Sequence, residues 1–337
     1  MRLEDDDWLR GKGVLLIAPR FFGYEQQICS AIDAAGGTAF YLDERPGNDF
    51  VSKGLVRINA DLVRTRIKRY YAEHVARIDG DMDYVLIISP EAINSDLVKW
   101  LRQRFKSAKF VLYMWDSIKN KNGTNNALIL PHFDRVFSFD QNDCKEYPNM
   151  TFRALFFIDA YAGERIGNAD EGYDLAFIGS GHSDRYRICR RIKEQIDRAG
   201  RRTFFFLYLH SRQHYRFLRA TNPAMRGSKS EDFAYVPLSP VEVSSVLSRS
   251  KAILDIQHQS QNGLTMRSIE VLGLRKKLVT TNKAIQDYDF YRPENIYCLD
   301  RELGSVPLDW LDAPYVDLPP EIYTQYSVSA WLREIVR

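Results

Sequence analysis

The chain has few cysteines and no long apolar run. Its four cysteines stand far apart and form no CxxC pair, so the sequence predicts no zinc site of paired cysteines. Scattered single cysteines are typical of reduced thiols and favour a cytoplasmic protein. The longest apolar runs, such as VLLIA at 14–18, are far shorter than the roughly 20 residues that span a bilayer. The first residues, MRLEDDDWLRGKG, lack the apolar core of a signal peptide.

The chain also carries no large excess of positive or negative charge. The 337 residues include 47 Lys and Arg against 44 Asp and Glu, a net charge of +3. Nucleic-acid-binding proteins usually carry a stronger basic bias, so nucleic acid is not an expected partner. A hydrophobic share of 45% and a charged share of 27% are typical of a globular protein, and the length fits two domains.

Common nucleotide and metal signatures are also missing. The turn after the first apolar run reads APRFFGYEQ, without GxGxxG, and the chain has no P-loop; both absences argue against a dinucleotide-dependent epimerase or dehydrogenase. The alternating acids Asp79, Asp81 and Asp83 stand just before an expected strand, and we interpret them as a solvated turn. Because no convincing DxD motif follows a strand, we expect no metal and no cofactor.

What the first half of the chain does contain is a series of short apolar runs separated by helical patterns. Such runs are typical of parallel strands buried on both faces, and their alternation with helices predicts a parallel α/β sheet. A helix is expected at 24–35, ended by Gly36-Gly37. The expected strands are 14–18, 38–42, 84–88, 109–114 and 135–138.

The same layout restarts near Tyr173. A strand at 174–178 leads into a glycine turn, a helix that ends at Gly200 and a strand at 203–209. The repeat predicts an α/β fold of two Rossmann-like domains that face each other across a cleft. We place the first Rossmann-like domain at 1–165, the second at 166–320 and, at 321–337, a C-terminal helix that packs back on the first domain.

The most informative segment runs from 236 to 282. Ser239 is a good N-cap for a short helix, a strand is expected at 252–256, and a polar loop follows to Gly263. The next helix starts near Leu264, and a further strand is expected at 277–281. That helix carries Arg267 and Glu270 three residues apart, and therefore on one face.

This order resembles the donor-binding half of GT-B-fold glycosyltransferases, and the resemblance implies that the domain at 166–320 binds the nucleotide-sugar donor and the domain at 1–165 the acceptor. In detail, GLTMRSIEVLGLRKKLVTTN at 263–282 and the following YDFY at 288–291 resemble the group-1-like glycosyltransferases of bacterial lipopolysaccharide and capsular polysaccharide synthesis. The segments WDS at 115–117 and FSFD at 137–140 also fit that family. The resemblance implies hexosyl or related transfer from a nucleotide-sugar donor to a glycan or lipid-linked acceptor.

The resemblance also implies donor contacts. In the family, the loop before the helix touches the donor diphosphate, the helix glutamate touches the ribose or sugar, and the first glycine turn of the domain lies near the phosphates. Glycine allows close backbone approach, while threonine hydroxyls and arginine forks suit phosphate without a metal. The same residues could instead serve helix starts, turns and an exposed ion pair. The donor-binding candidates are Gly179, Ser180, Gly181, Arg185, Pro237, Leu238, Asn262, Gly263, Leu264, Thr265, Arg267 and Glu270.

The catalytic mechanism is less constrained. Many retaining members of the family carry two glutamates eight positions apart; the second matches Glu270, but the first falls at Asn262. This departure slightly favours inverting, metal-independent chemistry, and it motivates the alternative of a non-catalytic scaffold that binds a nucleotide sugar. An inverting enzyme needs a general base. The candidates are Asp116, just past a strand, and Glu25, which could equally complement a helix dipole.

Two basic helical patterns favour one further hypothesis. They can dock onto an anionic leaflet at the inner face of the membrane, where lipid-linked acceptors reside, or they can simply form solvated faces. The lone histidines His74 and His182 are interpreted as structural. The basic residues concerned are Arg64, Arg66, Lys68, Arg69 and Arg77 in one pattern, and Lys99, Arg102, Arg104 and Lys106 in the other.

Overall fold

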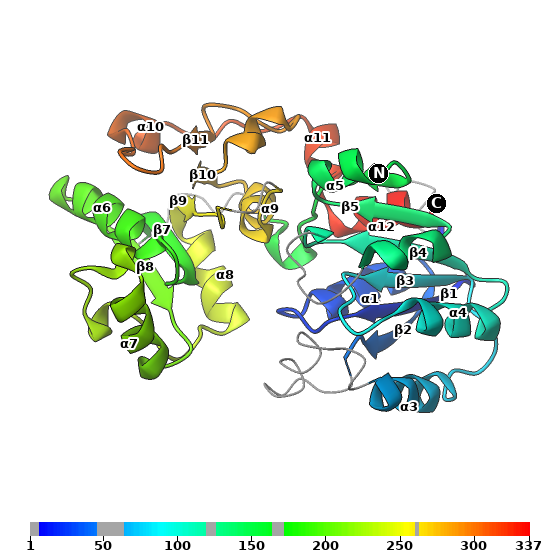
Figure 1. Ribbon diagram of the computed structural model, residues 1–337. Coiled ribbons are helices and arrows are strands. Elements are labelled where there is room, and N and C mark those ends of the chain that lie inside the picture. Colours follow the sequence, from blue (N-terminus) through cyan, green and yellow to red (C-terminus); the bar gives the residue numbers. More distant parts are fainter. Residues whose placement is uncertain (1–6, 46–63, 119–125, 164–171, 260–262) are drawn as a thin grey trace. The chain divides into compact units, whose positions relative to one another are not determined.

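The computed structural model describes residues 7–45, 64–118, 126–163, 172–259 and 263–337 (Figure 1). The chain forms two compact units. Unit 1 comprises Met1–Leu155 and Val328–Arg337, and unit 2 comprises Phe156–Ser327. The domain boundary expected at 165–166 lies outside the described residues.

The sheet of unit 1 has six described strands, all parallel, in the order β2-β1-β3-β4-β5-β6. Its inner strands are apolar runs buried on both faces, as the sequence predicts. The strands are β1 (Gly13–Ala18), β2 (Thr38–Asp43), β3 (Tyr84–Ile88), β4 (Lys109–Met114), β5 (Arg135–Ser138) and β6 (Met150–Phe152).

Helices cover both faces of this sheet. On one face, α3 (Arg64–Val75) and α4 (Ser95–Arg104) bury their apolar sides against β1, β3 and β4. Elsewhere α12 (Val328–Val336) packs on α1 (Tyr24–Ala34) and β4, where the Trp331 ring meets the Tyr113 ring edge-on with centroids 4.9 Å apart. The last helix of the chain is therefore part of unit 1. A short helix, α5 (Gln141–Glu146), precedes β6.

The sheet of unit 2 has five described strands, again all parallel, in the order β11-β10-β9-β7-β8. The first strand of the unit, β7, is flanked by β8 on one side and β9 on the other, so the strand order reverses there. The strands are β7 (Tyr173–Ser180), β8 (Thr203–Tyr208), β9 (Ser250–Asp255), β10 (Lys277–Thr280) and β11 (Ile296–Cys298).

The helices of unit 2 follow the same pattern. α6 (Arg185–Arg198) and α7 (Arg212–Thr221) contribute to one buried core with β7 and β9, and Figure 1 shows α6 and α8 (Pro240–Ser248) on opposite sides of β7. α9 (Met266–Gly273) packs on β9 and β10. Two short helices, α10 (Leu308–Asp312) and α11 (Pro320–Thr324), complete the unit. Among the helices in the described ranges, none combines the length and apolar character needed to cross a bilayer.

Candidate functional site

The carboxyl edge of the unit 2 sheet is the candidate site. In open α/β sheets, ligands bind beyond the carboxyl ends of the strands, at the point where the strand order reverses. Here that point is the pair of loops that follow β7 and β9. Gly179 and Ser180 end β7, Gly181 begins the first loop and Arg185 starts α6, while Gly263 to Thr265 belong to the second loop. Asn262 lies outside the described residues.

Asp255, the last residue of β9, fixes the start of α9. Its buried carboxylate accepts hydrogen bonds from Thr265 Oγ1 at 2.8 Å and Ser268 Oγ at 2.9 Å. Burial raises the pKa of Asp255 above its ordinary value, with these hydrogen bonds acting in the opposite direction. Thr265 is also the N-cap of α9, accepting from the backbone N–H of Ser268. The positive end of the helix dipole therefore lies at the carboxyl edge.

Arg267 and Glu270 form an ion pair on one face of α9, as their spacing predicts. Arg267 Nη1 lies 2.6 Å from Glu270 Oε2, and only 9% of the Glu270 side chain is exposed. The Tyr161 hydroxyl lies close to both: burial and the Glu270 charge raise the pKa of Tyr161 to about 12, while Arg267 opposes the shift. A carboxylate held in this way is an oriented acceptor for ligand hydroxyls.

Arg185, the first residue of α6, is a partly buried cation with neutral hydrogen-bond partners. Its Nε donates to the backbone carbonyl of Ile256 at 2.8 Å, and its Nη1 donates to Ser180 Oγ. Burial lowers the pKa of Arg185, although Asp255 acts to raise it. No salt bridge in the described part of the chain includes Arg185. The guanidinium is thus partly desolvated and hydrogen-bonds to neutral oxygens, with the Asp255 charge nearby, and a desolvated cation of this kind can hold an anionic ligand.

Asp184 and Arg301 form an ion pair that tethers the loops of the site and that sequence reasoning missed. Arg301 Nε and Nη2 donate to the two oxygens of Asp184 at 2.7 and 2.8 Å. Arg301 also donates to the carbonyl of Gln257 at 3.1 Å and to Thr281 Oγ1 at 3.3 Å. One guanidinium therefore joins the loops that follow β7, β9, β10 and β11.

Asn282 fixes the glycine of the second loop. Its Nδ2 donates to the carbonyl of Gly263 at 3.2 Å, while its Oδ1 caps the next turn by accepting from Ala284 N. Both side chain and glycine are buried. The 263–282 segment that carries the family resemblance is thus closed on itself by a hydrogen bond between its two ends.

The glycine turn after β7 is constrained by packing. A Cβ at Gly181 would lie 2.6 Å from the ring of buried Phe233, so only glycine fits there. Ser183 has a φ of +58°, a strained value for a residue with a side chain. Its buried Oγ has no hydrogen-bond partner within the described residues. An orphaned hydroxyl at this edge can serve a bound group.

Pro237 and Leu238 stand apart from this network. They lie on the segment between Ala234, which bridges Tyr208 at the end of β8, and α8. Pro237 is exposed and Leu238 is half-buried. Ser239 is the N-cap of α8, as predicted, and forms a capping box with Glu242. Neither Pro237 nor Leu238 takes part in the Arg301 hydrogen bonds that join the loops after β7, β9, β10 and β11.

Histidines gather at the same edge. The rings of His182 and His258 lie 6.2 Å apart, and those of His210 and His214 stack at 5.9 Å. Burial lowers the pKa of His182 to about 4, helped by the charge of Arg185 and the other three histidines. His182 is therefore neutral at physiological pH and can act as a hydrogen-bond donor or acceptor.

In unit 1, the candidate bases Glu25 and Asp116 lie in segments that meet at the carboxyl edge of the sheet. Glu25 is buried in the first turn of α1, and its Oε2 accepts from Phe21 N at 3.1 Å. Asp116 is exposed. The rings of Phe21 and Trp115 lie 5.5 Å apart and so join the two segments. The Glu25 contact favours its structural interpretation, and Asp116 remains the first candidate.

Asp143 positions the segment around Asp116, and the sequence did not reveal it. The buried carboxylate accepts from Ser117 Oγ at 3.1 Å, Ile118 N at 3.2 Å and Ser138 Oγ at 2.9 Å. These contacts bind together the WDS and FSFD segments that fit the family pattern. Burial raises the pKa of Asp143, while the hydrogen bonds oppose the shift.

Other polar clusters serve structure. Asp83 accepts from Lys12 Nζ and from Gly13 N, and Asp81 accepts from Met82 N, so both acids support the turn before β3. Across the described ranges, no three His, Cys, Asp or Glu side chains are grouped so as to hold a metal ion. The absence of a metal requirement stays a prediction.

Two arginines of the basic pattern on α4 are held by contacts within unit 1. Arg102 pairs with Asp134 at 2.7 Å, and Arg104 donates to the carbonyls of Gly80 and Ile78. These contacts favour a structural role for the two arginines. Arg77 lies beyond the end of α3, and α4 ends before Lys106. Membrane docking through either pattern stays a prediction.

Comparison with known proteins supports the fold. No protein-family model and no curated protein sequence matches the chain. The structure of Anabaena HepE in complex with UDP and glucose is 8% identical with a TM-score of 0.56, over 96% of this chain and 98% of that one. An alpha-glucosyltransferase in complex with UDP and a 13-mer DNA is 13% identical with a TM-score of 0.52, over 88% and 83%.

The fold is GT-B-like. At these identities the likeness concerns the fold alone, and it confirms the predicted pair of Rossmann-like units with parallel sheets.

Proposed function

We propose that the protein is a glycosyltransferase that moves a sugar from a nucleotide-sugar donor to a glycan or lipid-linked acceptor. The observation that carries this proposal is Arg185, a partly buried cation at the switch point of unit 2 whose hydrogen bonds go to neutral oxygens. A nucleoside diphosphate can form the charge-assisted hydrogen bonds to this guanidinium that its neutral partners do not. Both structures compared above were solved with UDP, which supports this choice.

The neighbouring groups fit the same ligand. The start of α9, capped by Thr265, presents backbone N–H groups and a dipole that favours a phosphate. Arg267 adds a second cation, and the Glu270 carboxylate is oriented to accept hydroxyl groups of a ribose or a sugar. As the bond between the anomeric carbon and the diphosphate breaks, these groups stabilise the charge that the leaving diphosphate takes up.

The acceptor side of the proposal rests on Asp116. In inverting transfer, the acceptor oxygen forms a bond to the anomeric carbon, its proton passes to a carboxylate, and the nucleoside diphosphate leaves. Asp116 is exposed at the carboxyl end of β4, and its backbone N–H donates to Ser89 Oγ at 3.3 Å. The proposal is metal-independent because the cations and the helix terminus supply the positive charge.

Binding and transfer are tested separately. Isothermal titration calorimetry with UDP-, GDP- and CMP-sugars in EDTA should detect one nucleotide sugar. Arg185→Gln should weaken its binding at least about tenfold, because a charge-assisted contact is worth roughly 1.5–3 kcal/mol. Arg187→Gln, an exposed arginine on the same helix paired with Glu302, is the matched control and should bind normally. If the wild type binds no nucleotide sugar, the proposal is wrong.

Turnover distinguishes an enzyme from a binding scaffold. The same sugars are incubated with candidate lipid-linked acceptors, and release of nucleoside diphosphate is measured. Asp116→Asn and Glu270→Gln should each lower the rate strongly, with Asp116→Asn leaving donor binding intact. Tight binding that yields no release of nucleoside diphosphate with any acceptor favours the scaffold alternative.

The cellular setting is the finer part of the proposal. The resemblance of the 263–282 segment supports surface polysaccharide or lipopolysaccharide synthesis at the cytoplasmic face of the membrane. A strain that carries Asp116→Asn at the native locus should lose or truncate its surface glycan. An unchanged glycan profile in such a strain would refute this assignment and leave the transferase chemistry to be judged on the purified protein.

A further inference from the structure

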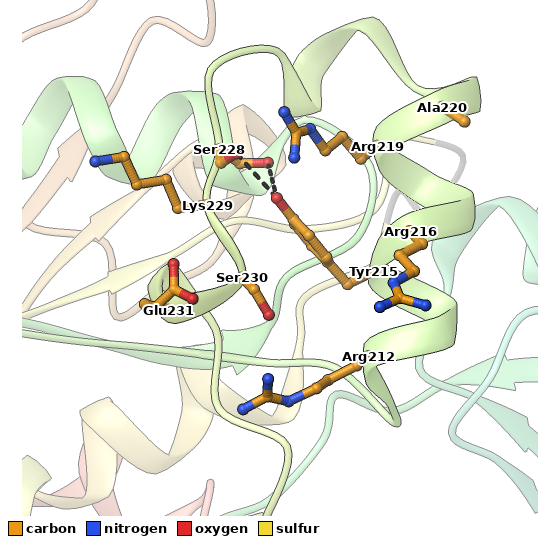
Figure 2. A pocket seen from close by; sticks show the side chains of 9 residues that line it. All are labelled: Arg212, Tyr215, Arg216, Arg219, Ala220, Ser228, Lys229, Ser230 and Glu231. Atoms are coloured by element: carbon orange, nitrogen blue, oxygen red, sulfur yellow. Dashed lines mark hydrogen bonds between the residues drawn. The ribbon is translucent and has the colours of Figure 1, made fainter.

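A basic pocket of about 670 Å³ lies on unit 2 (Figure 2). One wall is α7, and the other is the segment at 228–231. None of its lining residues belongs to the donor-binding set. The lining residues are Arg212, Tyr215, Arg216, Arg219, Ala220, Ser228, Lys229, Ser230 and Glu231.

Four cations surround this pocket. Arg212, Arg216 and Arg219 are spaced by four and three residues and therefore share one side of α7, and Lys229 comes from the facing segment (Figure 2). α7 contains no acidic residue that could neutralise them. Across the described residues, none of the salt bridges includes any of these four side chains.

Several basic residues of the preceding helix, by contrast, are ion-paired. On α6, Arg187 pairs with Glu302 at 2.7 Å, and Arg198 pairs with Glu194 at 3.5 Å. Like charges on neighbouring helical turns repel one another. The clustered arginines of α7 lack such acidic neighbours on their own helix, and a bound anion would relieve their repulsion.

The pocket is also built on fixed groups. Tyr215 is buried beneath it, and its hydroxyl donates to the carbonyl of Ser228 at 2.9 Å and accepts from Ser228 Oγ at 3.4 Å. Ser230 and the Tyr235 hydroxyl lie 2.9 Å apart, and the Arg212 guanidinium stands 5.5 Å from the centre of the Tyr235 ring. The two walls are thus connected before any ligand binds.

We propose that this pocket binds a phosphate-bearing ligand, with Arg216, Arg219 and Lys229 as its main contacts. Guanidinium groups match phosphate oxygens in pairs, and the number of cations suits a group with two or more negative charges better than a single carboxylate. Glu231 is the one acid in the lining. The Glu231 carboxylate can accept a hydrogen bond from a ligand hydroxyl next to the phosphate, and it disfavours a ligand that is anionic over its whole length.

Pyrophosphate is the soluble probe, and vesicles of phosphatidylcholine with or without phosphatidylglycerol are the lipid probe. Binding is measured by calorimetry and by vesicle sedimentation for the wild type and Arg216→Gln/Arg219→Gln. The matched control is Lys193→Gln/Arg198→Gln, which removes two charges from α6, where both residues are ion-paired. Arg185→Gln is included because pyrophosphate can also occupy the proposed donor site.

The proposal expects the α7 double variant to bind the probe at least about tenfold more weakly than the wild type, with the α6 control unchanged. Loss with pyrophosphate identifies a soluble ligand, and loss with phosphatidylglycerol vesicles alone identifies a lipid phosphate. The proposal fails if neither probe binds, if both double variants lose binding equally, or if only Arg185→Gln loses it. Nucleotide-sugar binding by the α7 variant should be normal, so failure here is separable from failure of the proposed transferase.

Discussion

Replacing Arg301 with glutamine should destabilise unit 2 by about 3 kcal/mol at neutral pH. Arg301 is 18% exposed and its partner Asp184 is 9% exposed, so the variant leaves a largely buried carboxylate without its cation. Removing one partner of a buried pair typically costs about 3–5 kcal/mol. The lower end applies because Arg301 keeps some contact with solvent. The loss of its bonds to Gln257 and Thr281 adds to the effect on the loops.

The effect should depend on pH, and its sign follows from the pKa of Asp184. Burial alone would raise this pKa, but the hydrogen bonds and charge of Arg301 hold it below the ordinary value. In the wild type, this contribution to stability is present above the unfolded pKa of about 3.9 and is lost as the pH falls through the lower folded value. Without Arg301, burial should raise the folded pKa above the unfolded one. The penalty of the variant should therefore shrink as the pH falls from 7 towards 4.

Native-state hydrogen exchange read by mass spectrometry is the assay, because it reports the opening free energy of peptides from unit 2 separately from those of unit 1. Arg187→Gln, which removes an exposed pair with Glu302, is the control and should change little. Asp184→Asn combined with Arg301→Gln should recover part of the loss, since no charge is then left buried. An equal penalty at pH 7 and pH 4.5, or an equal penalty in the control, would refute this account of the pair.

Three further changes probe other parts of the structure. Gly181→Ala should cost about 1–3 kcal/mol in chemical denaturation, because its Cβ meets the ring of Phe233, and Phe233→Leu in the same chain should recover part of that loss. His182 has a folded pKa of about 4 against an ordinary 6.5, so the wild type loses stability as the pH falls between these values. His182→Gln should lack that loss in thermal denaturation across the same range; parallel curves would contradict the shift. Asp143→Ala should destabilise unit 1 by about 1–3 kcal/mol, because the backbone N–H of Ile118 loses its buried acceptor. A loss below about 0.5 kcal/mol, which is the scatter for surface changes, would show that water replaces the carboxylate.

Most strands of the two sheets could be predicted from the sequence because they are continuous apolar runs. β3, β4 and β5 have the predicted bounds, and the others shift by one or two residues. β6 and β11 escaped prediction because each is three residues long with a single buried side chain. A run that short carries no periodicity, and only its pairing with the neighbouring strand makes it a strand.

The candidate site divides along a similar line. The glycine turn that leads to Arg185 and the helix that carries Arg267 and Glu270 could be proposed as candidates because glycine turns, caps and helical spacing are local signals. The anchoring groups Asp255 and Arg301 could not, because their roles depend on which strands are neighbours. Asp184 and Arg301 are 117 positions apart, and only the order β11-β10-β9-β7-β8 brings their loops to one edge. That order is a property of packing, which no local pattern encodes.

Positive φ values occur in three loops that follow strands, and also at Arg275 (φ +52°) between α9 and β10. Phe22, Ser89 and Ser183 have φ values of +49°, +42° and +58°, and each lies in the loop after a strand, namely β1, β3 and β7. Such conformations cost about 1–3 kcal/mol each and persist only where the surroundings enforce them. Ser89 Oγ accepts from Trp115 N, and the carbonyl of Ser183 accepts from Asn222 Nδ2 at 2.7 Å. These contacts hold the strained backbone of Ser89 and Ser183, so the conformations of the two loops are set by the fold before any ligand binds.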